Sequence, residues 1–383
     1  MSRRRVVGPA SHHPRYVVWE LTLKCDLACR HCGSRAGLAR AEELSLAECR
    51  DLVTQLADMG TQEITFIGGE AYLHPDWLAI IEATAQAGIR ATMTTGARRL
   101  TAAVAQQAAD AGLQAASVSI DGLQSTHDHL RAVPGSWHAA IAALQHIADA
   151  GMSPCTNTQI NQLNLEELEA LWGILKQAGV SAWQVQLTGP MGRAADQPEW
   201  LLQPWQMLEL MPRLGAMARE AAGLGVLIHA ANNLGYFGPY ETDLRAEPFG
   251  SCGAGRYVLG IESNGDIKGC PSLPSAPYVG GNVREAPLAE IWNQRAELAF
   301  ARNRTREDLW GFCKGCYYAD VCKGGCSWTS HTLLGRPGNM PYCHHRALEL
   351  KQAGRRERLV REQAAPGKPF DFGRFALIEE AWE

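Results

Sequence analysis

The sequence has no run of about 18 apolar residues, the length that a transmembrane helix requires. Near the N-terminus, Arg3, Arg4 and Arg5 are not followed by an apolar stretch long enough for a signal peptide. Net charge is also small, because 36 Lys and Arg residues stand against 40 Asp and Glu residues and leave a formal charge of −4. These absences predict a cytoplasmic protein that binds neither a membrane nor nucleic acid.

Short repeats and low-complexity tracts are missing as well. Of the 383 residues, 46% are hydrophobic and 20% are charged, which is enough apolar side chain for a large core. This composition excludes disordered, collagen-like and coiled-coil proteins. The length suggests two or three domains.

Cysteine, in contrast, is abundant: the chain has 12, most of them in an early and a late group. Thiols stay free in a reducing compartment, so grouped cysteines indicate metal or redox chemistry rather than disulfides. Cys49 and Cys155 stand alone where apolar residues belong, and both are predicted to be core residues. Cys49 lies on the inner face of a predicted helix that begins with a capping box of Ser45 and Glu48.

Between the two groups, β-branched or apolar runs alternate with helical patterns. Six strands are predicted at Tyr16–Leu23, Glu63–Ile67, Ile89–Thr94, Ala115–Ile120, Cys155–Ile160 and Ala182–Leu187. Helices are predicted after strands, for example at Leu46–Met59, Trp77–Ala87, Trp137–Ala150 and Leu165–Gln177. This alternation predicts an α/β fold with a parallel sheet, and six units make a partial (β/α)6 barrel.

Chemistry in such a barrel collects at the loops that leave the C-terminal ends of the strands. The residues found there, strand by strand, are Cys25, Cys29 and Cys32; Gly68, Gly69 and Glu70; Thr95 and Gly96; Ser119, Asp121 and Gly122; Asn161; and Thr188 and Gly189. Any one of these groups could be an ordinary turn. Six such groups at the same end of the barrel predict a functional site there.

The spacing of Cys25, Cys29 and Cys32 suits three irons of a four-iron, four-sulfur cluster and leaves the fourth iron without a protein ligand. A zinc site would need a fourth ligand, for which only His31 is near, and adjacent residues rarely bind one ion. An iron–sulfur cluster with an open iron is therefore preferred.

These features resemble the radical S-adenosylmethionine (SAM) superfamily, whose signature is this cysteine spacing after the first barrel strand. The resemblance implies that the open iron binds SAM and that a 5′-deoxyadenosyl radical removes a hydrogen from the substrate. It implies contacts of Gly68, Gly69 and Glu70 with the methionine amino group, of Ser119 and Arg131 with the carboxylate or ribose, and of Thr94, Thr95, Gln159 and Leu187 with the ribose and adenine. Ala71 departs from the family's frequent proline.

The late cysteines read Cys252-x12-Gly265-x4-Cys270, then Cys313-x2-Cys316-x5-Cys322-x3-Cys326, then Cys343. This order resembles the SPASM extension of radical SAM enzymes that modify peptides and proteins. The resemblance assigns Cys252, Cys270 and Cys326 to a first auxiliary cluster and Cys313, Cys316, Cys322 and Cys343 to a second. With the SAM cluster this implies three clusters in all, each of the four-iron type. The alternative is a zinc ribbon of Cys313, Cys316, Cys322 and Cys326.

The expected organisation follows from these motifs. A flexible arm (1–15) precedes the radical SAM barrel (16–225), a bridging region (226–250), the SPASM domain (251–346) and a tail (347–383). The bridge follows a predicted helix at Pro204–Gly223, and in the tail Leu348–Gln363 is predicted to be a helix with a solvated basic face.

By resemblance, the predicted function is that of a peptide maturase that abstracts hydrogen from a residue of a ribosomal precursor peptide. The alternatives are a sulfatase-maturase-like dehydrogenase that forms formylglycine, and a non-catalytic electron-transfer or zinc-stabilised scaffold. The residues before Tyr16 are too few for a leader-binding domain, which predicts either a separate leader-binding protein or recognition of the leader by the barrel and bridge. A flavodoxin or ferredoxin would supply electrons. Four residues could serve as general acid or base: His74, Asp121, Asp128 and Tyr236.

Overall fold

The structure is a computed structural model, and it describes residues 12–245 and 250–382. Most of the predicted arm, residues 1–11, and residues 246–249 of the predicted bridge lie outside the described residues.

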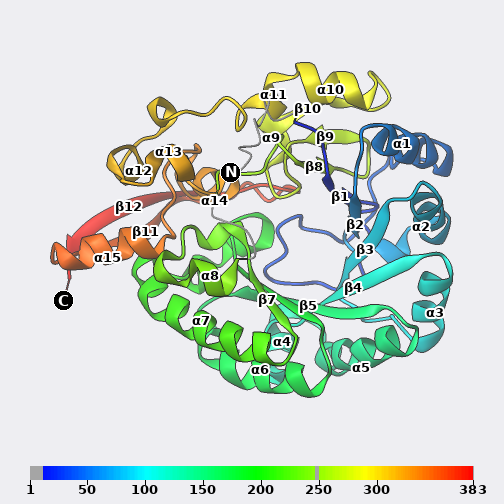
Figure 1. The fold of residues 1–383 in the computed structure, drawn as a ribbon, viewed down its shortest axis with the longest axis horizontal. Helices are drawn as coiled ribbons and strands as arrows, with labels where there is room; N and C mark the ends of the chain where they lie inside the picture. Colours follow the sequence, from blue (N-terminus) through cyan, green and yellow to red (C-terminus); the bar gives the residue numbers. More distant parts are fainter. Residues whose placement is uncertain (1–11, 246–249, 383) are drawn as a thin grey trace, which may run out of the picture.

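The main sheet has ten strands in the order β10-β9-β8-β1-β2-β3-β4-β5-β6-β7. The bounds of these strands are β1 (Tyr16–Glu20), β2 (Glu63–Ile67), β3 (Arg90–Thr95), β4 (Leu113–Ser119), β5 (Ser153–Ile160), β6 (Ala182–Leu187), β7 (Leu227–Ala230), β8 (Val258–Ile261), β9 (Asp266–Lys268) and β10 (Val279–Asn282). From β8 through β1 to β7 every pairing is parallel, whereas β9 pairs antiparallel with β8 and β10. The predicted α/β class and partial barrel are confirmed (Figure 1).

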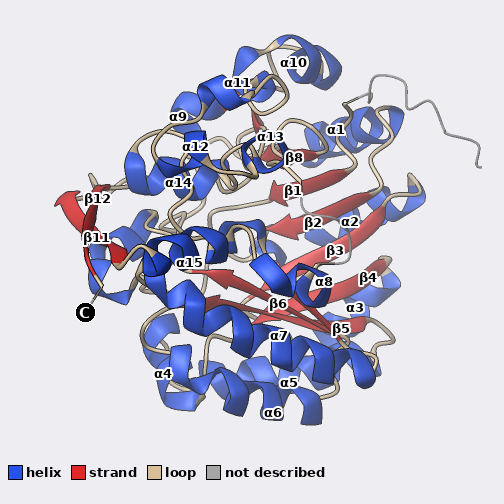
Figure 2. Cartoon of the chain, turned by 60° about the vertical axis from the view of Figure 1, so that its left-hand side comes forward, coloured by secondary structure: helices blue, strands red, loops and turns tan. Residues whose placement is uncertain are grey.

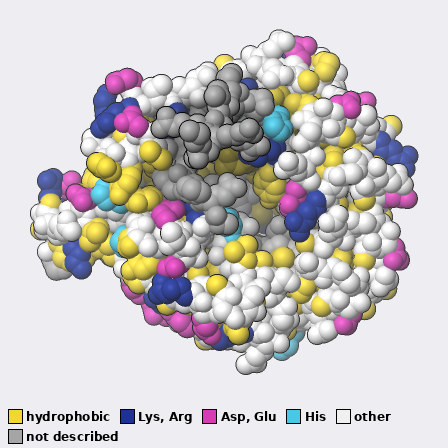
Figure 3. Space-filling view, viewed as in Figure 1, with side chains coloured by type: hydrophobic (Ala, Val, Ile, Leu, Met, Phe, Trp, Pro, Cys, Tyr) yellow, Lys and Arg dark blue, Asp and Glu magenta, His cyan; other side chains and the backbone are white. Residues whose placement is uncertain are grey.

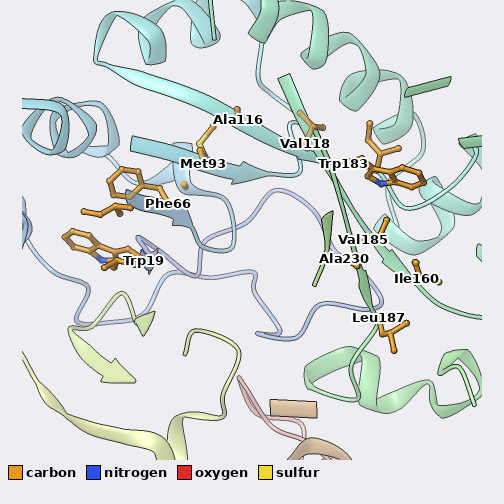
Figure 4. Packing of buried hydrophobic residues seen from close by; sticks show 14 of the residues in the cluster. Trp19, Phe66, Met93, Ala116, Val118, Ile160, Trp183, Val185, Leu187 and Ala230 are labelled. Atoms are coloured by element: carbon orange, nitrogen blue, oxygen red, sulfur yellow. The ribbon is translucent and has the colours of Figure 1, made fainter. Parts of the chain in front are cut away.

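Helices cover the outer face of the curved sheet, as Figure 1 shows. Those of the barrel are α1 (Leu46–Asp58), α2 (Trp77–Gln86), α3 (Ala102–Asp110), α4 (Gln124–Arg131), α5 (Ser136–Asp149), α6 (Leu168–Gln177), α7 (Met207–Gly223) and α8 (Glu241–Leu244). The predicted capping box of α1 is present, with Ser45 and Glu48 each bonded to the other's backbone N–H. Parallel strands are buried on both faces, so they are rich in apolar residues. Trp19 of β1 and Phe66 of β2, with ring centroids 6.1 Å apart, illustrate this packing (Figure 4).

The sheet extends beyond the six predicted strands at both edges. β7 adds to β6, and β8 from the cysteine-rich region adds in parallel to β1, with Tyr16 opposite Val258. In Figure 2 the strands β8, β1 and β2 follow one another as one continuous layer. The cysteine-rich region is thereby joined to the barrel at the strand that precedes the first cysteine group.

That region is built from short helices and loops. Its helices are α9 (Ser275–Tyr278), α10 (Leu288–Gln294), α11 (Ala296–Ala299), α12 (Phe312–Gly315), α13 (Ala319–Cys322) and α14 (Ser327–Leu334). Few of these segments are long enough to be stable alone. Packing and bound clusters would therefore supply much of the folding free energy.

The predicted helix at Leu348–Gln363 is wrong over most of its length. Helix α15 (His344–Gln352) ends at Gly354, whose φ of +69° favours glycine, and strand β11 (Arg355–Gln363) follows. Strand β11 pairs antiparallel with β12 (Arg374–Ala381) in a separate two-stranded sheet. Arg346 buries an ion pair with Glu357 of β11 at 2.5 Å and ties the hairpin to α15.

Among the described residues, no helix combines the length and apolarity that crossing a membrane requires. On the face in Figure 3, basic and acidic side chains are interspersed and neither sign forms a continuous field. This agrees with the near balance of charges in the sequence.

Candidate functional site

The first three cysteines lie in the loop after β1, and they line a cavity of about 220 Å³ at the C-terminal ends of the strands. The cavity is also lined by most residues that the resemblance assigned to SAM, namely Gly68, Gly69, Glu70, Thr94, Thr95, Ser119, Arg131 and Gln159. Leu187 is not among the lining residues, and its side chain packs in the main core.

Gly68 and Gly69 allow the loop after β2 to lie directly against the loop after β1. A Cβ atom at either position would overlap the carbonyl oxygens of Thr22 or Lys24. The Gly69 N–H donates to the Thr22 carbonyl at 2.7 Å and the Glu70 N–H to the Lys24 carbonyl at 2.8 Å. The glycines thereby bring Glu70 beside the cysteine loop.

Glu70 is 1% exposed and half of its carboxylate is unpaired. Its Oε2 accepts a 2.8 Å hydrogen bond from the Gly96 N–H, but Oε1 makes none with any described residue. Burial raises the pKa of Glu70 to about 8. A buried carboxylate with a free acceptor is costly unless a donor fills the cavity, and the ammonium group of SAM fits that requirement.

Arg131, the last residue of α4, connects Cys29 with Asp121. Its guanidinium donates to Cys29 Sγ at 3.6 Å and lies 2.5 Å from the Asp121 carboxylate, which also accepts from His31 Nε2 at 3.0 Å. Burial alone would raise the pKa of Asp121, but the charges of Arg131 and His31 outweigh it and hold that pKa well below its usual range. A carboxylate that stays ionised is unsuited to general acid or base work.

Arg193, which the sequence did not single out, also lines the cavity. It lies in the loop after β6, and its guanidinium donates to the carbonyl oxygens of Cys29 at 2.7 Å and Ala36 at 3.1 Å. The one feature of the sequence that could have indicated Arg193 as a site residue is its position after the sixth strand. Arg193 thus braces the cysteine loop from the far side of the barrel.

The cysteines predicted for the second auxiliary cluster surround a second, smaller cavity. Its lining contains all four of them, Cys313, Cys316, Cys322 and Cys343, with Tyr236 and Arg346. Burial raises the pKa of Cys343 to about 11. A thiol with a raised pKa has to lose its proton before it can bind a metal. Binding of a cluster at this cavity would therefore release protons and stabilise the folded loops that carry the four cysteines.

The three remaining cysteines of the late group also lie together. Cys252 and Cys270 pack on one small apolar cluster with Trp328. Burial, and next the charge of the Cys252 thiolate, raise the pKa of Cys270 to about 12 and of Cys326 to about 11.

Within residues 12–245 and 250–382, no three His, Cys, Asp or Glu side chains are close enough together to hold a single metal ion.

The other acid–base candidates have contacts that favour structural roles. Buried His74 accepts a hydrogen bond from the Asp76 N–H, and Asp128 accepts three from residues at the start of α5. The ring of Tyr236 lies 4.5 Å from that of Tyr318, tilted by 44°, beside the second auxiliary group. Cys49 is 1% exposed, as predicted, whereas Cys155 is only partly buried.

Comparisons with known proteins agree with the cysteine patterns. The sequence model of the radical SAM superfamily matches residues 19–178, and that of the SPASM iron–sulfur cluster-binding domain matches residues 252–317. An AdoMet-dependent heme synthase from Methanosarcina barkeri is 29% identical over 87% of this chain and 97% of its own length. The mycofactocin maturase MftC of Mycobacterium tuberculosis is 28% identical over 82% of this chain and 78% of its length.

Among solved structures, SuiB of Streptococcus suis bound to SAM has the same fold. The TM-score is 0.70 at 17% sequence identity, over 88% of this chain and 78% of SuiB. SuiB has also been solved with its precursor peptide SuiA.

Proposed function

Because this chain belongs to the radical SAM superfamily and carries a SPASM domain, we propose that it removes a hydrogen atom from a residue of a ribosomal precursor peptide. When bound, the iron–sulfur cluster supplies the electron that splits SAM into methionine and a 5′-deoxyadenosyl radical. The observation that carries the proposal is the buried Glu70 Oε1, unpaired among the described residues in the cavity that Cys25, Cys29 and Cys32 line.

Each lining residue has a role in this proposal. Cys25, Cys29 and Cys32 hold three irons, and Glu70 accepts a hydrogen bond from the amino group of SAM. Ser119 and Arg131 face the carboxylate or ribose, and the remaining predicted contacts, Thr94, Thr95 and Gln159, line the ribose and adenine. Arg131 also donates toward Cys29 Sγ, which would stabilise a thiolate there.

The two late cysteine groups would hold auxiliary iron–sulfur clusters. Cys313, Cys316, Cys322 and Cys343 supply four thiolates to one of them. Cys252, Cys270 and Cys326 supply three to the other, which leaves one iron for a further ligand. These clusters would accept or deliver electrons during the oxidation that follows hydrogen removal, with a flavodoxin or ferredoxin as the external donor.

A leader-binding protein would hold the part of the precursor peptide that lies outside the barrel cavity, whose volume is about 220 Å³.

A second candidate is AdoMet-dependent heme synthesis, the activity that the name of the M. barkeri relative states. One observation favours it: the alignment with the heme synthase of M. barkeri covers 97% of that relative's length, whereas the alignment with MftC covers 78%.

One experiment separates the two. The reconstituted protein is incubated anaerobically with SAM and dithionite, together with either a precursor peptide encoded beside its gene or iron-coproporphyrin III. A mass change in the peptide supports the maturase, and loss of mass from the porphyrin supports the second candidate. An unchanged peptide in the presence of 5′-deoxyadenosine formation would contradict the maturase.

A further inference from the structure

The loop that joins β11 and β12, residues 364–373, returns from the edge of the molecule to the mouth of the barrel. Figure 1 shows the hairpin beside α15 at the left edge. At the barrel end, Phe370 is 9% exposed and packs with Leu23, Ala36 and Met191. Cys25 and Cys32 pack against the same group. A side chain from the C-terminal hairpin therefore lies on the loop that carries the first cysteine group.

Asp371 fixes the loop to the cysteine segment. Its Oδ1 accepts a 2.8 Å hydrogen bond from Arg35 Nε, three residues after Cys32, and its carbonyl oxygen accepts one of 2.7 Å from the Gly192 N–H. Arg35 also pairs with Asp196 at 2.7 Å. The Asp371 side chain is 6% exposed, so water screens its pairing with Arg35 weakly. One residue thus joins the hairpin, the cysteine loop and the loop after β6.

Phe370 is held in an unfavourable backbone conformation. Its φ of +56° belongs to the left-handed region, which costs a residue with a side chain about 1 kcal/mol or more. Two cations lie over its ring, Lys268 at 4.3 Å and Arg40 at 5.7 Å from the centroid. Such strain persists only where the surroundings determine the position of the side chain, and it is commonest at functional sites.

Trp328 of α14 packs on the same apolar group as Phe370, and also on the group that contains Cys252 and Cys270. Its Nε1 is 3.4 Å from Met191 Sδ, and a Cβ atom at Gly189 would meet its ring. The apolar group beside the first cysteine loop therefore receives one aromatic side chain from the hairpin loop and one from the cysteine-rich region.

We propose that residues 364–373 are a positioning element that covers the loop carrying Cys25, Cys29 and Cys32, with Phe370 as the residue that shields the SAM cluster. The proposal rests on the function proposed above. Phe370 acts through packing on the cysteine loop, so it is a positioning residue. The Asp371–Arg35 pair holds it in place.

The test compares Phe370→Ala and Asp371→Asn with Ile378→Ala in anaerobically reconstituted protein. Ile378 is the matched control, because it lies on β12 of the same hairpin, outside the loop, and is 40% exposed. The SAM cluster is identified as the reduced cluster whose EPR signal changes when SAM is added. The measurement is the rate at which the iron chelator bathophenanthroline abolishes that signal. This readout does not depend on turnover or on a known substrate.

We expect Phe370→Ala to lose that signal about fivefold faster or more, since removing the ring favours local opening of residues 364–373. Asp371→Asn should change the rate in the same direction by less, and Ile378→Ala should match the wild type. Phe370→Leu, which keeps an apolar side chain, should restore most of the protection. Equal rates in all variants, or an equal increase in Ile378→Ala, would overturn the inference. A wild type with no SAM-sensitive signal would instead contradict the proposed function itself.

Discussion

The carboxylate of Asp121 lies 2.5 Å from the guanidinium of Arg131, and both side chains are almost completely buried. Arg131 in turn contacts Cys29, and His31 of the cysteine loop donates to the same carboxylate. The loop that carries the first cysteine group is therefore anchored to the end of β4 and to α4 through one buried ion pair.

Removing that charge should destabilise the site. Asp121→Asn leaves Arg131 buried without its counterion, and breaking such a pair costs about 3 kcal/mol or more. We expect a lower unfolding midpoint and fewer irons per chain after reconstitution, measured by calorimetry and iron analysis. Glu166→Gln, at a carboxylate that is 78% exposed, is the control and should change stability by less than about 0.5 kcal/mol. Wild-type values for both variants would show that the pair does not anchor the loop.

Glu70→Gln should weaken the binding of SAM. An amide accepts a hydrogen bond but carries no charge to balance the ammonium group, and losing a buried charge partner costs about 2 kcal/mol or more, a 30-fold rise in Kd. Equilibrium binding of SAM to the reconstituted protein measures the change. The matched control is Glu63→Gln, on the strand that precedes the Glu70 loop, where the side chain is partly exposed. An unchanged Kd in Glu70→Gln would rule out the assigned contact.

Cysteine substitutions should separate cluster ligands from core thiols. Cys322→Ala removes one of four thiolates around the second auxiliary cavity, and we expect about four fewer irons per chain. Cys155→Ala replaces a thiol that stands apart from the cysteine groups and should retain the full iron content. Zinc in place of iron, or no loss of iron from Cys322→Ala, would argue against the second auxiliary cluster.

His127 predicts a pH dependence of stability. Burial, and next the charge of Arg131, lower its pKa to about 4, and its Nδ1 accepts a hydrogen bond from the Asp121 N–H. The unfolded chain therefore takes up a proton near pH 6.5 that the folded protein does not, so the contribution of His127 to stability falls as the pH drops from 6.5 toward 4. Between pH 6.5 and 5.5 this contribution falls by about 1 kcal/mol. In denaturant titrations, the change in stability between these pH values should differ by that amount between the wild type and His127→Gln; an equal change in both would exclude the assigned role of His127.

Much of the barrel site could be predicted from the sequence, because its chemistry depends on local spacing. The cysteines fall in a single loop, and Gly68, Gly69 and Glu70 follow the next strand directly, so strand order alone brings them together. Helical patterns separate the short strands clearly, so the sequence predicts which residues follow each strand.

Contacts between distant segments could not be predicted in the same way. Strand β11 has only Leu359 and Val360 as apolar residues among charged ones, so its alternation resembled a solvated helix. Its partner β12 and the loop with Phe370 meet the barrel through residues that are more than 300 positions away in sequence, such as Arg35. No local pattern encodes such a pairing. Arg193 could not be predicted for the same reason, because it acts by donating hydrogen bonds to carbonyl groups of the distant cysteine loop.

The most direct test of the account is whether the chain cleaves SAM. Protein reconstituted anaerobically with iron and sulfide, to about 12 irons per chain, is mixed with SAM and dithionite, and 5′-deoxyadenosine is quantified by chromatography. The account predicts its formation by the wild type and none by a variant in which Cys25, Cys29 and Cys32 are replaced by alanine. Iron-loaded wild-type protein that leaves SAM intact with every reductant would contradict it.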